Sequence, residues 1–398
     1  MKKKIAYIIS RFPTVSETFI LYEILELTKL GMEIDVFPLI HQSGSIIHSE
    51  VQAIAPKVHY PKLFSLDTII DHFFWLRRKP KEYIQTIIQV LGKNFRSVKF
   101  LSRAIIVILQ SAQVARKIEE LGIQHIHAHS ATHPTLMAYM IWRLTGLPYS
   151  FTAHSSDIYF NQTMLSEKIH RACFVVTISN YNVDFLKGVS PGTSTGKIRV
   201  IHCGIDPAKF KAEPAKHMGN LLKIICVGRL EKIKGHQYLI EACAQLKAQN
   251  ISFHCYLVGD GELQSKIQQE IDHLDLGQNV ELLGFQTHDK VAGLLNQADV
   301  LVLPSLSEGI PVAVMEGMAS GLPIVATAVT GVPELVEDGI TGLLVPSKNS
   351  VALTEAIQKL FHSPDMRQQM GMAGRKKVLD QFNLQNSALE LYNTLISS

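Results

Sequence analysis

The chain has 398 residues, more than a single hydrophobic core usually supports, so we expect two domains. Hydrophobic residues make up 46% of it and charged residues 19%, which describes a folded globular protein rather than a disordered one. The net charge of +4 is a mild excess that does not require a nucleic-acid partner.

The first ten residues, MKKKIAYIIS, are basic and then apolar, as in a signal peptide. The apolar run Ile5–Ile9 is too short for such a peptide, and Arg11 and Pro13 interrupt it, so we expect a first strand. No stretch reaches the roughly 18 consecutive apolar residues of a membrane-spanning helix. We therefore expect any contact with a membrane to be made at its surface.

The loop after this strand reads SRFPTVSETFI and places polar side chains at the carboxyl edge of the expected sheet. Arg11 and Glu17 would project from that edge, and Ser16 could cap the following helix. The loop lacks the glycines of a dinucleotide-binding fingerprint, which disfavours a nicotinamide-dependent dehydrogenase.

Short apolar runs alternate with helical patterns along the whole chain, which indicates an α/β fold with parallel sheets. The expected strands are Ile5–Ile9, Ile34–Pro38, His125–Ala128, Tyr149–Ala153, Phe174–Ile178, Ile198–His202, Lys223–Val227, Phe253–Val258, Val280–Leu282, Val300–Leu303, Pro323–Ala326 and Gly342–Val345. We expect a first domain at 1–205, a polar, proline-containing linker at 206–220 and a second domain at 221–380. A C-terminal helix at 381–398 would pack back on the first domain.

The five cysteines lie mostly in apolar segments and show no CxxC spacing (Cys173, Cys203, Cys226, Cys243 and Cys255). We therefore expect reduced thiols and a cytoplasmic protein.

Residues 63–109 interrupt the alternation with two stretches that mix aromatic and basic side chains, FFWLRRKPKEY and KNFRSVKFLSR. One interpretation is a pair of helices with solvated basic faces. Another is an interfacial surface that binds anionic lipid headgroups through Lys and Arg while aromatic side chains enter the lipid boundary. A nucleic-acid patch is a third interpretation, but no nucleic-acid motif accompanies it.

A histidine follows the expected strand Tyr149–Ala153, in the sequence AHSSD that contains His154 and Asp157. The carboxyl ends of parallel strands bind ligands in α/β proteins, so His154 is the preferred functional histidine. A second cluster (His125, His127, His129 and His133) suggests zinc. Neighbouring strand residues point to opposite faces and no carboxylate or cysteine completes the set, so we expect no metal. His127 and His129 share a face and could line a cleft.

Two glycine-containing loops follow the first strands of the second half. In GRLEKIKG, Arg229 and Lys234 flank a loop at a strand end, where Arg can bind two oxygens and Lys supplies a point charge for a diphosphate. A solvated basic loop is the alternative. In VGDGE, Gly259 would bring its backbone close to a ligand, although tight-turn chemistry explains this glycine equally well.

The segment SEGIPVAVME holds Glu308 and Glu316, with seven residues between them. It follows an apolar strand and opens a short helix at Pro311, a residue suited to the first helical turn, with Gly321 suited to the C-terminal cap. The free backbone N–H groups of such a helix start favour phosphate. Two carboxylates beside them indicate a ligand with both hydroxyl and phosphate groups.

Together, GRLEKIKG, EGIPVAVME and GLPIVATAVTGVPELVEDGITGLLV resemble the retaining family 4 glycosyltransferases. The resemblance is strongest over residues 222–345. It implies a GT-B fold, with two Rossmann-like domains facing across a cleft and the nucleotide-sugar donor on the C-terminal one. The donor would be UDP- or GDP-linked. No metal or other cofactor would be needed, because basic residues and helix ends stabilise the leaving diphosphate.

The resemblance also implies roles for individual residues. Arg229 and Lys234 would bind the diphosphate, and Glu316 the ribose hydroxyls. Glu308 would hold hydroxyls of the transferred sugar near C3 and C4. The backbone of the loop before the helix would approach the same sugar (Gly309, Ile310 and Pro311). His154 would bond the O6 atom of the sugar and assist at the reacting face.

The N-terminal loop SRFPTVSETFI is similar to that of a subgroup acting on bacterial exopolysaccharides such as colanic acid. That similarity implies a glycan or lipid-linked oligosaccharide acceptor, bound on the side of Arg11, Ser16, Glu17, His129 and Asp157. It also implies a place in the cytoplasm or on the inner face of the plasma membrane. A GT-B nucleotide-sugar epimerase or hydrolase, and a non-catalytic nucleotide-sugar-binding subunit, are the alternative functions.

Overall fold

A computed structural model describes residues 3–12, 18–42, 50–194, 196–210 and 221–398. The chain divides into two compact units, one formed by residues 1–201 with 384–398 and the other by 202–383. The division thus falls at 201/202 and 383/384, where the sequence suggests 205 and 380. Residues 211–220 of the expected linker lie outside the described part of the chain.

The first unit is built on a parallel sheet with strand order β2-β1-β3-β4-β5-β6. Its strands are β1 (Lys4–Phe12), β2 (Glu33–His41), β3 (His125–His129), β4 (Tyr149–Ala153), β5 (Val175–Thr177) and β6 (Ile198–Val200). Its helices are α1 (Thr18–Lys29), α2 (Val51–Ile54), α3 (Leu66–Arg78), α4 (Pro80–Asn94), α5 (Val98–Glu120), α6 (His133–Thr145), α7 (Ser156–Tyr159), α8 (Leu165–Arg171), α9 (Asn180–Val189) and α17 (Leu384–Ile396).

The second unit carries a parallel sheet with strand order β12-β11-β10-β7-β8-β9. Its strands are β7 (Leu222–Val227), β8 (Phe253–Val258), β9 (Val280–Gly284), β10 (Val300–Leu303), β11 (Ile324–Thr327) and β12 (Gly342–Val345). Its α-helices are α10 (His236–Ala248), α11 (Gln264–His273), α12 (His288–Gln297), α13 (Val312–Ala319), α14 (Val332–Leu335), α15 (Ser350–His362) and α16 (Pro364–Gln381). Short 3-10 turns occur at Ala55–Lys57 in the first unit and at Pro207–Lys209 and Lys232–Lys234 in the second.

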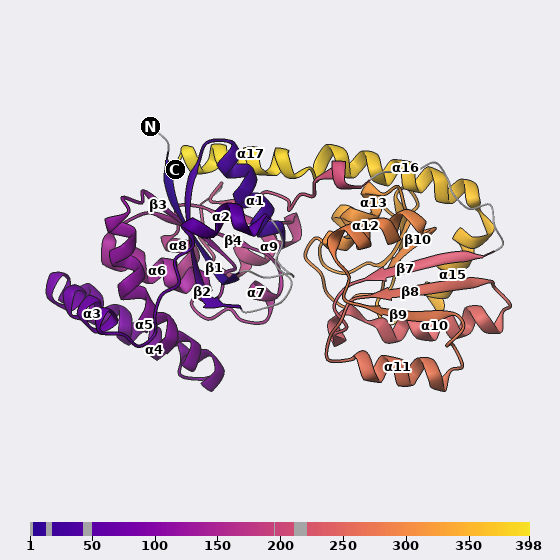
Figure 1. Cartoon of the computed structure of the whole chain (residues 1–398), viewed down its shortest axis with the longest axis horizontal. Helices are drawn as coiled ribbons and strands as arrows, with labels where there is room; N and C mark the ends of the chain where they lie inside the picture. The colour runs from indigo at the N-terminus through magenta and orange to yellow at the C-terminus, as the bar shows by residue number, and fades with distance from the viewer. Residues whose placement is uncertain (1–2, 13–17, 43–49, 195, 211–220) are drawn as a thin grey trace. The chain divides into compact units, whose positions relative to one another are not determined.

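Burial on both faces explains why apolar runs marked the strands so well. Every residue of β10 and β11 is buried, and so is every residue of β3 and β4. The last helix, α17, packs against α1 and places Leu391 and Leu395 in a core shared with β1 (Figure 1). The C-terminal segment therefore completes the first unit.

The insertion at 63–109 forms three helices instead of a pair, because its second basic stretch begins the long α5. This helix is long and apolar enough to span a membrane by length and composition, yet 44% of the relevant window is buried. Val107, Ala112 and Ala115 belong to the core of the first unit, and α5 packs against α6. We therefore regard α5 as a core helix that carries α3 and α4 on the same side of the unit (Figure 1).

The five cysteines are free: Cys226, Cys243 and Cys255 are buried, Cys203 is half-buried and Cys173 is exposed. Burial raises the pKa of the Cys226 thiol, which keeps it protonated and unreactive.

Candidate active site

The second sheet reverses its strand order between β7 and β10, and the loops that follow these two strands meet there. The N–H of Leu306 donates to the carbonyl of Ile233 over 2.8 Å. Gly235 has φ +65°, and a Cβ atom there would lie 2.2 Å from the Pro304 carbonyl oxygen. Only glycine allows this approach. In open α/β sheets ligands bind at such a reversal of strand order, so the two loops form the leading candidate site.

An ion pair joins the two loops. The Nζ atom of Lys234 lies 2.7 Å from Oε1 of Glu308, and the Ser305 hydroxyl donates to the same oxygen over 2.6 Å. The backbone N–H of Glu308 donates to the Thr330 hydroxyl over 3.0 Å. Glu308 is buried, whereas the Lys234 side chain keeps about a fifth of its surface exposed (21%). Two residues that are 74 positions apart, both expected at the site, are therefore in direct contact.

Arg229 has a different partner. Its guanidinium lies 2.6 Å from Glu231 on the same loop, and its side chain is 61% exposed. An exposed Arg–Glu pair contributes little free energy, so Arg229 can exchange Glu231 for another anion at little cost. Its long side chain stays at the surface of the second unit.

Glu316 lies in the second turn of α13, as expected, and is buried. Its Oε1 atom is 3.0 Å from Nε2 of His288, the first residue of α12. The hydrogen bond with Glu316 raises the pKa of His288 against the opposing effect of burial. The expected position of Pro311 is wrong by one residue: its ψ of 117° makes it the residue before the helix, which begins at Val312.

The glycine at the end of β8 is explained by packing between loops. Gly259 has φ +140°, and a Cβ atom there would lie 2.0 Å from the carbonyl oxygen of Gly228. This close contact between two loops requires glycine at position 259, whereas its contact with a ligand stays a prediction.

The segment Gly309–Pro311 is buried against the loop after β11. A Cβ atom at Gly331 would lie 2.2 Å from the carbonyl oxygen of Gly309 and 3.3 Å from the Ile310 side chain. This close packing fixes the backbone that precedes α13.

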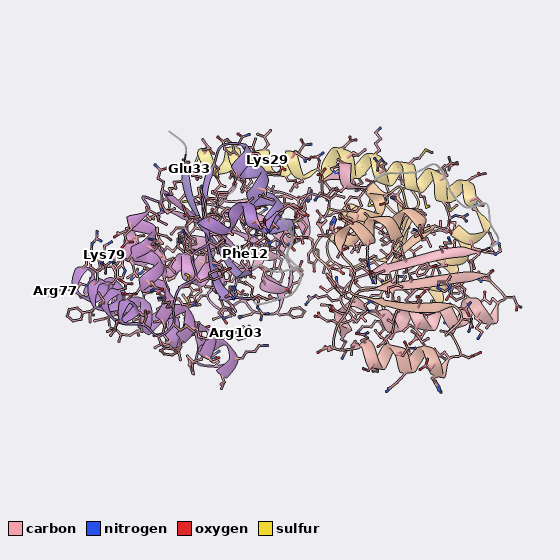
Figure 2. The ribbon with its side chains drawn as sticks, in the orientation of Figure 1. Phe12, Lys29, Glu33, Arg77, Lys79 and Arg103 are labelled. Atoms are coloured by element: carbon pink, nitrogen blue, oxygen red, sulfur yellow. The ribbon has the colours of Figure 1, made fainter. Side chains whose placement is uncertain are left out.

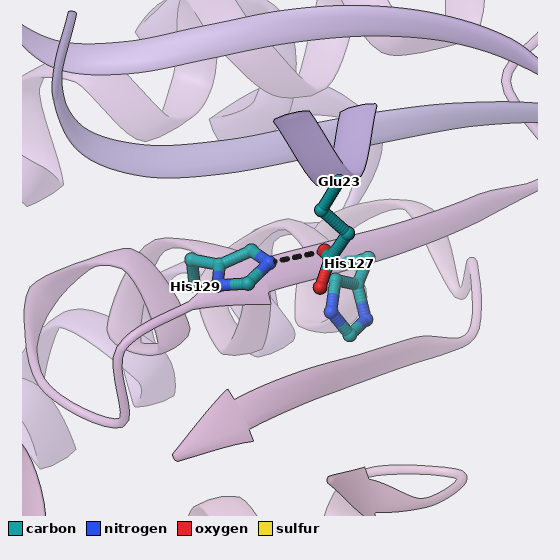
Figure 3. A group of neighbouring side chains, drawn as sticks. All are labelled: Glu23, His127 and His129. Carbon is teal, nitrogen blue, oxygen red and sulfur yellow. Dashed lines mark hydrogen bonds and ion pairs between the residues drawn. The ribbon is translucent and has the colours of Figure 1, made fainter. Parts of the chain in front are cut away.

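In the first unit, a chain of side-chain contacts runs from Tyr7 to His154. The Tyr7 hydroxyl donates to Oε1 of Glu23 over 2.7 Å. The same oxygen lies 2.7 Å from Nε2 of His129, the pair joined by the dashed line in Figure 3. Nδ1 of His129 is 3.3 Å from Nε2 of His154. Burial raises the pKa of Glu23, but the charge and hydrogen bond of His129 and the Tyr7 hydroxyl outweigh it and lower that pKa. The contacts lie at the strands where the first sheet reverses its order: His129 ends β3, and Tyr7 lies within the neighbouring strand β1.

Glu23 also corrects the expectation that no carboxylate completes the histidine cluster. Atoms of Glu23, His127 and His129 that could each ligate a metal lie within 4.8 Å of one another. His127 is fully buried, and its two ring nitrogens are 2.8 Å from the Ser150 hydroxyl and 3.0 Å from the Thr152 hydroxyl. His127 would have to give up one of these hydrogen bonds to bind a metal, and its burial means that it does not line an open surface.

Asp157 holds the loops around His154. One of its oxygens accepts from the N–H groups of His154 and Ser155 over 3.0 and 2.8 Å, and the other accepts from the N–H of Ala131 over 2.7 Å. His154 itself is half-buried. Burial lowers its pKa to about 4, against the opposing charges of Asp157 and Glu23, so its imidazole is neutral at pH 7. A neutral imidazole offers one donor and one acceptor.

The remaining acceptor-side residues are only partly described. Arg11 is exposed and lies within β1, opposite Ile40 of β2, because that strand runs to Phe12 instead of ending at Ile9. Ser16 and Glu17 lie outside the described residues.

Sequence reasoning missed Glu23, His288, Ser305 and Thr330. Glu23 left a signal, since it interrupts the buried stripe Ile20, Ile24 and Leu27 of α1 with a carboxylate. Ser305 lies three positions before Glu308, so its contact is local, whereas Thr330 and His288 meet their glutamates only through tertiary contacts.

Comparison with known families accounts for nearly the whole chain. The family described as Glycosyltransferase Family 4 matches residues 16–209, and the family described as Glycosyl transferases group 1 matches residues 209–377. The chain is 29% identical to WcaL of Salmonella typhimurium, over 96% of this chain and 97% of that protein. WcaL carries the name of a colanic acid biosynthesis glycosyltransferase. The chain is also 36% identical to AmsK of Erwinia amylovora, named as an amylovoran biosynthesis glycosyltransferase, over 50% of each chain.

Solved structures share the fold. HepE from Anabaena, crystallised with UDP, aligns over 100% of both chains with a TM-score of 0.76 and 19% identity. A sucrose-phosphate synthase from Thermosynechococcus elongatus aligns over 100% of both chains with a TM-score of 0.74 and 21% identity. This likeness shows that the two units have the GT-B type of fold expected from the sequence.

Proposed function

Because the chain belongs to the glycosyltransferases that join a family 4 domain to a group 1 domain, we propose that it is a retaining transferase of a hexose from a UDP- or GDP-linked donor. The observation that carries this proposal is the Lys234–Glu308 pair at the strand-order reversal of the second sheet. It places one cation and one hydroxyl-binding carboxylate side by side, which suits a sugar attached to a diphosphate. HepE, a neighbour in fold, was crystallised with UDP and glucose.

The chemistry follows from charge. The bond between the anomeric carbon and the diphosphate oxygen breaks, an acceptor hydroxyl oxygen bonds that carbon on the same face, and the hydroxyl proton leaves with the nucleoside diphosphate. Negative charge builds on the diphosphate as the bond breaks, so Lys234 and Arg229 stabilise the transition state more than the bound donor. These two cations would do the work for which other enzymes use a metal, and we propose that no metal or cofactor takes part.

Recognition would be divided between the two glutamates. Glu308, fixed by Ser305 and Lys234, would accept hydrogen bonds from hydroxyls of the sugar. Glu316, eight positions further along, would bind the ribose hydroxyls in exchange for His288. The neutral His154 of the first unit would bond O6 of the sugar.

For the acceptor we propose a lipid-linked oligosaccharide of exopolysaccharide synthesis, reached from the cytoplasmic side of an anionic membrane. The names of WcaL and AmsK support this assignment, since both refer to the synthesis of bacterial exopolysaccharides. The acceptor side would lie at the end of the first sheet near Arg11, His129 and Asp157.

The test is incubation of the purified chain with UDP- and GDP-hexoses and a lipid-linked acceptor. We expect free nucleoside diphosphate and glycosylated lipid, with the anomeric configuration of the donor preserved in the product by NMR. Glu308→Gln should abolish transfer, whereas Glu262→Gln, which changes another carboxylate at a strand end of the same unit, should not. Release of sugar without acceptor would point to a hydrolase or epimerase. Nucleotide binding without any turnover would indicate a non-catalytic subunit.

A further inference from the structure

Helix α3 presents its apolar stripe to solvent. The face that it turns to the protein includes Thr68, Asp71 and Trp75, of which Asp71 is paired with Arg116 at 2.8 Å. Its outward face repeats apolar residues at helical spacing: Leu66 (79% exposed), Ile69 (68%), Ile70 (54%), Phe73 (61%) and Leu76 (38%). A surface helix of a globular protein normally has the opposite arrangement, with its continuous apolar stripe against the core.

Exposed apolar side chains also occur in the segments next to α3 in the sequence. Phe64, just before the helix, is 89% exposed, and Val98 at the start of α5 is 85% exposed. Among the described residues, 12 of the 25 exposed large apolar side chains fall between positions 64 and 106. The remaining 13 are spread over the rest of the described chain, so exposure of this kind is concentrated here. An exposed apolar stripe of five residues along one face of a helix marks an interaction site.

Positive charge accompanies this surface. Residues 62–103 contain nine Lys and Arg against three Asp and Glu, a net charge of +6, whereas the whole chain has +4. The rest of the protein is therefore slightly negative, at −2. The densest run is Arg77 to Lys81 at the junction of α3 and α4. Figure 2 labels Arg77 and Lys79 there, at the edge of the first unit, and Arg103 on α5.

We propose that the exposed apolar side chains and the basic side chains of residues 62–103, here called the α3–α4 face, bind an anionic lipid bilayer. The apolar stripe would enter the boundary of the acyl chains while Arg77, Lys79 and Lys81 contact the phosphate headgroups. The positive charge of the α3–α4 face favours an anionic bilayer over a second copy of the chain as its partner. Two α3–α4 faces would bring +6 against +6, whereas an anionic bilayer complements both the charge and the apolar stripe.

The geometry suits a helix that lies on a membrane. Helix α3 has 13 residues and a length of about 20 Å, too short for the roughly 30 Å hydrocarbon core. Binding at this face would bring the protein to the lipid-linked acceptor of the proposed function, and the proposal rests on the proposed function only for that link. Membrane binding and sugar transfer can fail independently, and they are measured separately.

The test is flotation of the full chain with vesicles of phosphatidylcholine alone or mixed with phosphatidylglycerol. We expect binding to the anionic vesicles, and at least tenfold weaker binding to the neutral ones or in high salt. The variant Ile69→Ser/Ile70→Ser/Phe73→Ser should lose at least tenfold in partition coefficient. Arg77→Gln/Lys79→Gln/Lys81→Gln should lose a similar factor on anionic vesicles alone.

Matched controls come from the second unit. Ile340, Val351 and Met372 are 57%, 55% and 60% exposed, and their joint change to Ser should leave vesicle binding unchanged. Joint change of the exposed lysines Lys348, Lys359 and Lys376 to Gln should do the same.

Three outcomes would overturn the proposal: no binding to anionic vesicles, equal loss in the control variants, or a dimer in sedimentation that the Ile69→Ser/Ile70→Ser/Phe73→Ser variant abolishes while vesicle binding is absent. The separate readout is the rate at which nucleoside diphosphate is released in an assay with a water-soluble acceptor. If it stays at the wild-type rate in these variants, a loss of vesicle binding reports on the α3–α4 face and not on the transfer site.

Discussion

Replacing Lys234 by methionine tests the ion pair with Glu308 on both stability and catalysis. The variant leaves the Glu308 carboxylate buried with the Ser305 hydroxyl still bonded to it. Removing one partner of a fully buried pair costs about 3–5 kcal/mol, and partial exposure of Lys234 reduces this to about 2 kcal/mol. The expected fall in the unfolding temperature of the second unit is about 5 °C.

The double variant Lys234→Met/Glu308→Gln separates structure from chemistry. It removes the uncompensated charge and keeps a hydrogen-bond partner for Ser305, so most of the lost stability should return. Activity should not return, because removal of one preorganised electrostatic group typically costs about 10²–10³ in kcat. Lys232→Met in the same turn is the control, since Lys232 is exposed. Both quantities are measured, by thermal unfolding and by nucleoside diphosphate release. Wild-type stability in Lys234→Met, or activity in the double variant, would refute the reasoning.

Other predictions address packing, pH and metals. Gly259→Ala places a Cβ 2.0 Å from the Gly228 carbonyl, and urea unfolding should show a loss of several kcal/mol; a loss below about 1 kcal/mol would contradict it. Because the pKa of His154 is lowered to about 4, the free energy of unfolding should fall as pH drops from about 6.5 towards 4, and it should fall less steeply in His154→Gln. Equal slopes would argue against a neutral imidazole in the folded protein. The raised pKa of His288 has the opposite effect on stability. The stabilisation from the His288–Glu316 pair is complete below about pH 6.5 and is lost as pH rises through the raised pKa. The difference in unfolding free energy between the wild type and His288→Gln should therefore shrink as pH rises, and a constant difference would count against the pair. Chelation with EDTA should leave the transfer rate unchanged; loss on chelation that zinc restores would instead favour a metal at Glu23, His127 and His129.

Much of the fold could be predicted because parallel strands are buried on both faces. Runs such as Val300–Leu303 have no polar alternation to confuse them with other elements, and each expected strand is present. The rule that ligands bind at the carboxyl ends of parallel strands predicts that Lys234 and Glu308 lie at one edge of the second sheet. Their direct ion pair was not predictable, because it depends on how two loops 74 residues apart pack.

The orientation of α3 shows where sequence patterns stop. Its sequence has apolar residues on both sides, with Trp75 inside and Phe73 outside, so the hydrophobic pattern does not say which side faces the core. The choice is made by tertiary contacts: Asp71 pairs with Arg116, and the Trp75 indole donates to the Ala112 carbonyl over 3.0 Å. His288 is similar, since only the approach of α12 to α13 brings it to Glu316.

The central claim, that the second unit binds a nucleotide sugar through its diphosphate, is tested most directly by nucleoside diphosphate binding. The measurement is the unfolding temperature of the full chain with UDP, GDP or ADP. We expect one of them to raise it, because a ligand at 100 times its Kd stabilises the native state by about 2.7 kcal/mol. The Lys234→Met/Glu308→Gln variant should lose most of that rise. No rise with any nucleoside diphosphate, or an equal rise in the variant, would contradict the claim.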